Sequence, residues 1–198
     1  MLKWEVGTSK EFIKQPWKNG RGITTQLACD TSAPYLWRLS SAELTESGPF
    51  SDFPLYQRWV CLLSGGPVLL NHSEGRKKEL TQYLPYKFSG AMTTEVSVIR
   101  PAVDFNLFLL NGKTKGSLYI TFFSSFEEYQ FPLSGQEHFI FCVQGNLNVT
   151  ERHTHQSFLL RPFELLRVSR IGNTEYPNLK IVAGDHSAVA LWIPIHNL

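Results

Sequence analysis

The fold is decided by the stretch Arg58-Trp-Val-Cys-Leu-Leu-Ser-Gly65 and by a similar stretch 80 residues later, His138-Phe-Ile-Phe-Cys-Val-Gln-Gly145. Both contain a polar residue, then six residues dominated by apolar types, then a glycine that opens a turn. In each copy a short apolar run follows, and then a Leu-Pro or Arg-Pro step. A repeat of this length predicts two copies of one barrel-like unit. The alternative is one continuous sandwich whose halves are similar by chance.

Short strand-like runs, separated by glycine, proline, asparagine or serine, fill most of the chain. No segment repeats apolar residues at three-four spacing for long enough to predict an amphipathic helix of three turns. The expected strands are 37–44, 57–63, 67–70, 96–99, 105–110, 117–123, 138–143, 147–150, 157–160, 165–168 and 189–193. We expect the basic run Arg76-Lys77-Lys78 to lie in a loop. The series is typical of an all-β sandwich or barrel.

Composition excludes several classes of protein. A formal net charge of +2 is too small for an electrostatic grip on nucleic acid or on an anionic membrane. No apolar run approaches the roughly 20 residues that span a bilayer, and Met1-Leu2-Lys3-Trp4-Glu5 does not resemble a signal peptide. Cys29, Cys61 and Cys142 are odd in number and widely spaced, which indicates reduced thiols. These features predict a cytoplasmic globular protein.

Polar residues recur inside the apolar strands. Alternate residues of a strand share a face, so Arg38 and Ser40 point one way, as do Asp104 and Asn106. Together with Arg58, and with Lys18 in a glycine-punctuated turn, they would line an interior that is cationic on balance. Such a pocket can hold a carboxylate through bidentate arginine contacts. The alternative is that Arg38 or Arg58 pairs with Asp104, which does not exclude binding.

Metal and nucleophile chemistry are not indicated. The first half contains only His72, in a hydrophilic stretch, and the run His153-Thr154-His155 falls at a hairpin tip between charged neighbours. There is no Gly-x-Ser-x-Gly elbow and no phosphate-binding glycine loop. We therefore expect no metal, no cofactor and no catalytic residue.

Four motifs in register resemble the HutD/Ves family: PWKNG (16–20), WRLS-x-AE (37–43), GPFS-x-FP-x-x-x-R (48–58) and DFN (104–106). The resemblance is close over the first half and loose over the second. It implies a bicupin, that is, two cupin-like (jelly-roll-type) β-barrels packed together, with the site in residues 1–113 and the second barrel in 114–198.

The resemblance also implies an association with histidine utilisation, as a sensor or governor of histidine degradation that binds an N-formylglutamate-like or urocanate-like acid. The family residues that carry over as ligand-binding are Lys18, Asn19, Thr24, Arg38, Ser40, Arg58, Asp104 and Asn106.

The chain departs from the family pattern at two places. Arg21 makes the turn Gly20-Arg21-Gly22 bulkier, and Gln26 stands where a glutamate is usual, which removes a plausible general base. Both favour binding over catalysis. Two other readings stay open: a metal-free cupin isomerase or hydrolase of a small carboxylic acid, with Asp104 as acid or base, and a protein-interaction module that dimerises through Ala188–Ile195.

Overall fold

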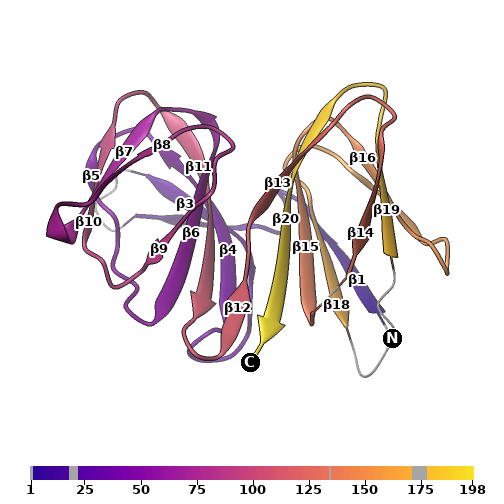
Figure 1. Cartoon of the computed structure of the whole chain (residues 1–198), viewed down its shortest axis with the longest axis horizontal. Coiled ribbons are helices and arrows are strands. Elements are labelled where there is room, and N and C mark those ends of the chain that lie inside the picture. Colours follow the sequence, from indigo (N-terminus) through magenta and orange to yellow (C-terminus); the bar gives the residue numbers. More distant parts are fainter. Residues whose placement is uncertain (1, 18–21, 134, 171–177) are drawn as a thin grey trace. The chain divides into compact units, whose positions relative to one another are not determined.

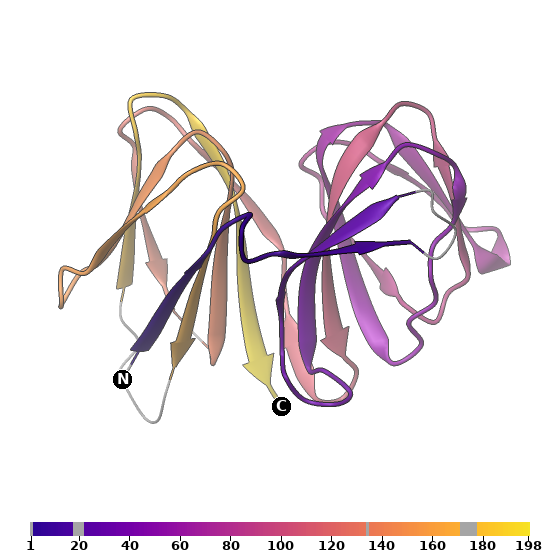
Figure 2. The ribbon, with the colours of Figure 1, turned by 180° about the vertical axis from the view of Figure 1, so that it is seen from behind.

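The structure is a computed structural model that describes residues 2–17, 22–133, 135–170 and 178–198. By its internal contacts the chain divides into two compact units. We call Phe12–Lys115 with Leu198 the N-terminal unit, and Met1–Glu11 with Gly116–Asn197 the C-terminal unit. The first segment of the chain thus belongs to the unit that the second half builds (Figures 1 and 2).

The N-terminal unit contains two antiparallel sheets (Figure 1). The larger sheet has the order β2 (Ile13–Pro16), β3 (Ile23–Cys29), β4 (Trp37–Leu44), β11 (Ala102–Leu110), β6 (Tyr56–Gly65) and β9 (Tyr86–Ser89). The smaller sheet has the order β5 (Gly48–Pro49), β10 (Thr94–Val98), β7 (Val68–His72) and β8 (Lys77–Leu80). A 3₁₀ turn, Ser73–Gly75, joins β7 to β8.

The C-terminal unit repeats this plan. One sheet has the order β1 (Leu2–Gly7), β18 (Leu165–Arg170), β15 (Glu137–Gln144) and β20 (Ala188–Asn197), with β13 (Tyr119–Phe123) on the far side of β20. The other has the order β14 (Glu128–Pro132), β19 (Asn178–Ala183), β16 (Leu147–Glu151) and β17 (Ser157–Leu160). The chain passes from the first unit to the second at β12 (Thr114–Gly116).

Each unit has its core between its two sheets. In the N-terminal unit, Val60 and Leu62 of β6 pack with Leu70 of β7 and Val96 of β10, and all four are buried. The C-terminal unit likewise buries residues from both of its sheets in one core: Ile140 and Cys142 of β15, Val149 of β16, Leu160 of β17 and Ile181 of β19. Apolar residues at alternate positions of facing strands explain both cores, because one face of each strand points inward.

The two units share strand register as well as order. Arg58 lies opposite Phe88 in the β6–β9 pair, and His138 lies opposite Val168 in the β15–β18 pair, 80 residues on in both strands. The all-β prediction is confirmed. Closed barrels were expected, whereas the described residues of each unit form two separate sheets.

The predicted strands mostly coincide with observed ones, and the differences concern edges. The run 76–78 was expected in a loop, but Lys77–Leu80 forms β8 at the edge of its sheet, where lysines are tolerated because one side faces solvent. The strands β1, β2, β5, β9, β12, β14 and β19 had no expected counterpart. Most of them have only two to five residues, which is too short for alternation to be recognised in the sequence.

All three cysteines are free thiols. Among the described residues, no helix is long and apolar enough to cross a membrane. The cytoplasmic location stays a prediction.

The hairpin glycines that end the two repeated stretches are close to the backbone of a neighbouring segment. Gly65 has a φ of +72°, and a Cβ there would lie 2.0 Å from the carbonyl oxygen of Pro101. Gly145 has a φ of +75°, and its Cβ would lie 2.6 Å from that of Ser187. Only glycine fits both the left-handed conformation and the approach.

Gly65→Ala should therefore destabilise the fold by more than the left-handed backbone alone explains. Gly112→Ala is the matched control, because Gly112 has a φ of +69° but nothing within 4 Å of its Cβ position. We expect about 1–2 kcal/mol for the control and about 1–3 kcal/mol more for Gly65→Ala, measured by urea unfolding. Equal losses would show that the close approach is not a constraint.

Candidate functional site

The N-terminal unit holds a cavity of about 500 Å³ over the inner face of its larger sheet. Strands β4 and β11 contribute alternate residues to it, because alternate side chains share a face. The segment from Pro49 to Phe53 forms part of the opposite wall. The lining residues are Gln15, Pro16, Trp17, Thr24, Arg38, Ser40, Ala42, Leu44, Pro49, Phe50, Ser51, Phe53, Arg58, Asp104, Asn106 and Phe108.

A row of three side chains crosses the cavity floor. Phe108 of β11 lies opposite Arg38 of β4 on one side and opposite Arg58 of β6 on the other. Each guanidinium carbon is 4.8 Å from the centroid of the Phe108 ring. The two cations are also 5.6 and 5.5 Å from the ring of Phe53. These distances allow cation–π attraction, which lowers the cost of burying two like charges together.

Arg58 is the more enclosed cation, with 5% of its surface exposed. Its NH2 group donates to Oδ1 of Asn106 at 3.1 Å and its NH1 group donates to the carbonyl of Ser51 at 3.3 Å. The rings of Phe50 and Phe88 lie 5.0 and 4.9 Å from its guanidinium carbon. Burial lowers the pKa of Arg58 to about 10, so the side chain is still charged at neutral pH.

Arg38 is only half-buried and less firmly held. Its guanidinium lies 5.9 Å from the Tyr35 ring, and its buried Nε has no hydrogen-bond partner among the described residues. No ion pair joins it to another described residue. Arg38 is therefore the cation best placed to take an anionic partner from solution.

Asp104 is the one carboxylate among the residues that line the cavity, and it is 1% exposed. Its Oδ1 accepts the backbone N–H of Ala42 at 2.9 Å, and hydrogen bonding from the side chain of Asn106, two residues along β11, also lowers its pKa. Burial raises the pKa of Asp104 to about 6, although both hydrogen bonds and the charge of Arg58 oppose that rise. A bulge in the β11–β6 pairing falls between Val103 and Asp104.

The alternative that Asp104 pairs with an arginine is not what the structure shows. Within the described part of the chain, no carboxylate–guanidinium contact within 4.0 Å joins Asp104 to Arg38 or Arg58. The cavity thus holds two cations and one acid whose pKa is raised to about 6.

The remaining predicted site residues divide into two groups. Ser40, 2% exposed, and Thr24 line the cavity, and Thr24 accepts the indole N–H of Trp17 at 2.9 Å. Lys18 and Asn19 lie outside the described residues, as does Arg21. Gln26 lies opposite Ser40 in the β3–β4 pair but is not among the residues that line the cavity.

Sequence reasoning missed the aromatic part of the site. Phe108 follows Asp104 and Asn106 at the same two-residue spacing, so alternation could have placed it on the cavity face. Phe50 and Phe53 stand inside the GPFS-x-FP motif, which was used only as a family signature.

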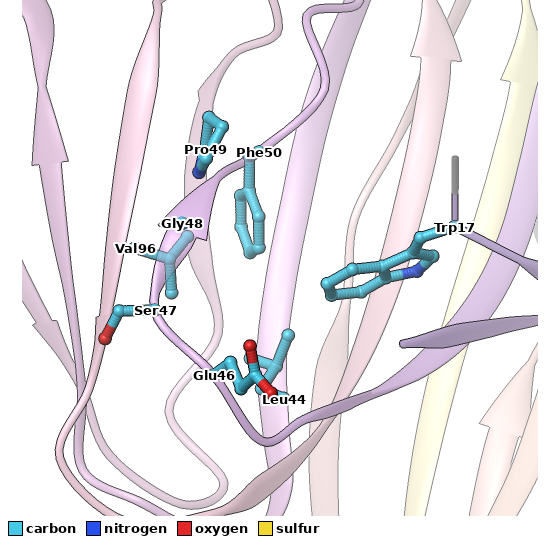
Figure 3. A pocket seen from close by; sticks show the side chains of 8 residues that line it. All are labelled: Trp17, Leu44, Glu46, Ser47, Gly48, Pro49, Phe50 and Val96. Atoms are coloured by element: carbon cyan, nitrogen blue, oxygen red, sulfur yellow. The ribbon is translucent and has the colours of Figure 1, made fainter. Parts of the chain in front are cut away.

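A small recess adjoins the cavity and shares Trp17, Leu44, Pro49 and Phe50 with it (Figure 3). Its volume is about 20 Å³, the space of a single water molecule. A metabolite therefore has to occupy the larger cavity.

The histidines do not form a metal site in the described residues, where no group of three or more His, Cys, Asp or Glu side chains could hold an ion. His72, expected in a hydrophilic stretch, is buried on β7. Its Nδ1 lies 2.8 Å from the Thr94 hydroxyl and its Nε2 lies 3.1 Å from the Tyr86 hydroxyl. His153 and His155 lie in the exposed turn between β16 and β17.

Solved structures place this fold among the cupin-like all-β proteins. A conserved protein of unknown function from Pseudomonas aeruginosa PAO1 superposes with a TM-score of 0.89 at 23% identity, over 99% of this chain and 100% of that one. HutD from Pseudomonas fluorescens SBW25 gives 0.81 at 22% identity over the same shares. A cupin 2 conserved barrel domain protein from Leptotrichia buccalis gives 0.57 at 11%, over 91% of each chain. These likenesses show the fold.

The family is shown by sequence. The HutD family model matches residues 9–186, so the chain belongs to the HutD family, which includes the Ves proteins. An uncharacterized 21.2 kDa protein in the hutC 3′ region of Pseudomonas putida is 33% identical over 111 residues, 54% of this chain and 58% of that protein. Protein Ves of Escherichia fergusonii is 33% identical over 95 residues, 46% of this chain and 50% of Ves. The matches thus span about half the length of these relatives.

The raised pKa of Asp104 predicts a pH-dependent stability. Its folded pKa of about 6 exceeds the ordinary 3.8, so this residue favours the folded state below pH 3.8 and loses that contribution as pH rises through 6. Relative to Asp104→Asn, the wild type should lose about 2 kcal/mol of unfolding free energy between pH 4 and pH 7. Urea unfolding across that range measures it.

Asp52→Asn is the control, because Asp52 is an exposed acid on the segment beside the same cavity. It should follow the wild-type pH dependence. Parallel curves for the wild type and Asp104→Asn would contradict the assignment.

Proposed function

We propose that the protein binds a small anionic metabolite, without a metal, in the cavity of the N-terminal unit. The observation that carries this proposal is the row Arg38–Phe108–Arg58: two guanidiniums face one cavity, and neither is ion-paired to a described carboxylate. A ligand carboxylate would supply the missing counter-charge through charge-assisted hydrogen bonds. The other polar groups of the cavity are hydroxyls, an amide and a single carboxyl, a donor set suited to an organic acid and not to a metal ion.

The contacts suggest separate roles. Arg38 makes the principal contact with the carboxylate, and Arg58 contributes charge from a fixed position. Ser40, Thr24 and Asn106 orient the ligand by neutral hydrogen bonds. A cavity of about 500 Å³ lies in the range of small-molecule pockets.

The ligand class comes from the family. A relative is encoded in the hutC 3′ region, which links the family to histidine utilisation, so we favour an N-formylglutamate-like or urocanate-like acid. A sensor or governor of histidine degradation is the role that fits a binding protein of this kind. We further propose that the two units are two copies of one cupin-like unit of two sheets, since the shared strand register supports a duplication.

The second candidate function is a metal-free enzyme acting on the same kind of acid. It is favoured by Asp104, a buried carboxyl in the cavity whose pKa of about 6 suits a general acid or base. Turnover of an acid by chelator-treated wild type, lost in Asp104→Asn, would establish it.

The protein-interaction reading has less support. Strand β20, the proposed dimer surface, pairs with β15 on one side and β13 on the other, and most of its residues are buried. Dilution experiments would test the homodimer directly.

Thermal unfolding of chelator-treated protein with N-formyl-L-glutamate, urocanate, histidine or glutamate tests the lead proposal. One acid at about a hundred times its dissociation constant should stabilise the fold by roughly 2.7 kcal/mol. Arg38→Ala should abolish the shift, and so should Arg58→Met, which keeps the packing of the long side chain. Arg100→Ala, which removes an exposed arginine of the same unit, should keep it.

Two outcomes would contradict the proposal: no shift with any of the acids, or a full shift in Arg38→Ala. A shift that appears only when zinc, iron or manganese is restored would also contradict it, and would favour a metal-dependent site.

A further inference from the structure

Asn106 lies between the acid of the cavity and its buried cation. It stands two residues from Asp104 on the same face of β11, where hydrogen bonding from its side chain lowers the pKa of Asp104, and its Oδ1 accepts from NH2 of Arg58 at 3.1 Å. A primary amide has its donors on one side and its acceptor on the other. The orientation of this amide therefore requires Asp104 to act as an acceptor, and it occupies one donor of Arg58.

The charges around Asp104 are few. Arg58 lies on β6 and Arg38 on β4, the two strands that flank β11, and neither is within 4.0 Å of the carboxylate. Cys61 of β6 is the other titratable neighbour, and burial raises the pKa of its thiol to about 12, so it stays neutral. The β3 residue in the cavity is Thr24, which carries no charge.

An anion in this cavity would affect the protonation of Asp104 in two ways. It would place a second negative charge in a buried site near Asp104, which disfavours the ionised carboxyl. It would also compete with Asn106 for NH2 of Arg58, because the charge-assisted bond to a carboxylate is the stronger one. Both effects act on the same three residues.

We propose that anion binding in this cavity is coupled to the uptake of one proton by Asp104, through a reversal of the Asn106 side-chain amide. This inference rests on the proposed function. In the bound state NH2 of Arg58 donates to the ligand instead of to Asn106. Oδ1 of Asn106 turns to accept the new O–H of Asp104, and its NH2 group turns toward the anion. The proton comes from solvent, and the O–H bond is the only covalent bond that forms.

Isothermal titration calorimetry with N-formyl-L-glutamate at pH 7.0, in phosphate and in Tris, measures the protons exchanged, since the two buffers differ in ionisation enthalpy. With a pKa of about 6, Asp104 is about 90% ionised in the free protein, so about 0.9 proton should be taken up per ligand. The dissociation constant should rise about tenfold from pH 7 to pH 8. Neither the acid, whose carboxyls titrate far below this range, nor Arg58, already protonated, would contribute.

Asp104→Asn should bind without proton uptake and with the same affinity at pH 7 and pH 8, whereas Asp52→Asn should behave as wild type. The two-buffer measurement on wild type decides the question even if Asp104→Asn does not fold. Binding with no proton exchange would overturn the coupling and leave the proposed function standing. No binding heat at pH 6 or pH 7 would overturn both.

Discussion

The site depends on keeping two like-charged guanidiniums on the floor of one cavity. Burying an arginine is unfavourable unless its donors are satisfied and its charge is balanced. Here aromatic rings lower the cost through cation–π attraction. The guanidinium carbon of Arg58 lies within 5.5 Å of the centroids of four phenylalanine rings, and one of these, Phe108, lies between Arg58 and Arg38. Asn106 satisfies one donor, and Asp104 contributes negative charge without pairing. The cavity therefore carries an excess of positive charge, which the proposed anion would balance.

The C-terminal unit carries different side chains at the positions that correspond to the cavity floor. In the N-terminal unit, Phe108, Asn106 and Asp104 of β11 lie opposite Arg58, Val60 and Leu62 of β6, in that order. In the C-terminal unit, the corresponding residues of β20 are Pro194, Trp192 and Ala190, which lie opposite His138, Ile140 and Cys142 of β15. The acid and the amide of one unit thus correspond to alanine and tryptophan in the other. Burial lowers the pKa of His138 to about 4, so a neutral side chain stands where the N-terminal unit holds a cation. The polar side chains of the N-terminal cavity thus have mostly apolar counterparts in the C-terminal unit.

The sequence was informative where alternation was strong. The repeated stretches predicted two related units, and the paired polar residues on 37–44 and 104–106 placed Arg38, Ser40, Asp104 and Asn106 on one face, as observed. Alternation cannot fix cross-strand register, so the insertion of Phe108 between two arginines could not be foreseen. Alternation also could not show whether Asp104 pairs with an arginine, because that depends on distances between side chains of β11 and β6. The edge strand β8 was not predicted because a run of charged residues is also typical of a loop.

The most direct test of the central claim is a crystal structure of the protein grown with N-formyl-L-glutamate and chelator. The account predicts a ligand carboxylate within hydrogen-bonding distance of both Arg38 and Arg58, inside the cavity floored by Phe108. Ligand density outside the cavity, or an empty cavity with Arg38 ion-paired to Asp104 in protein that binds the acid in solution, would contradict it.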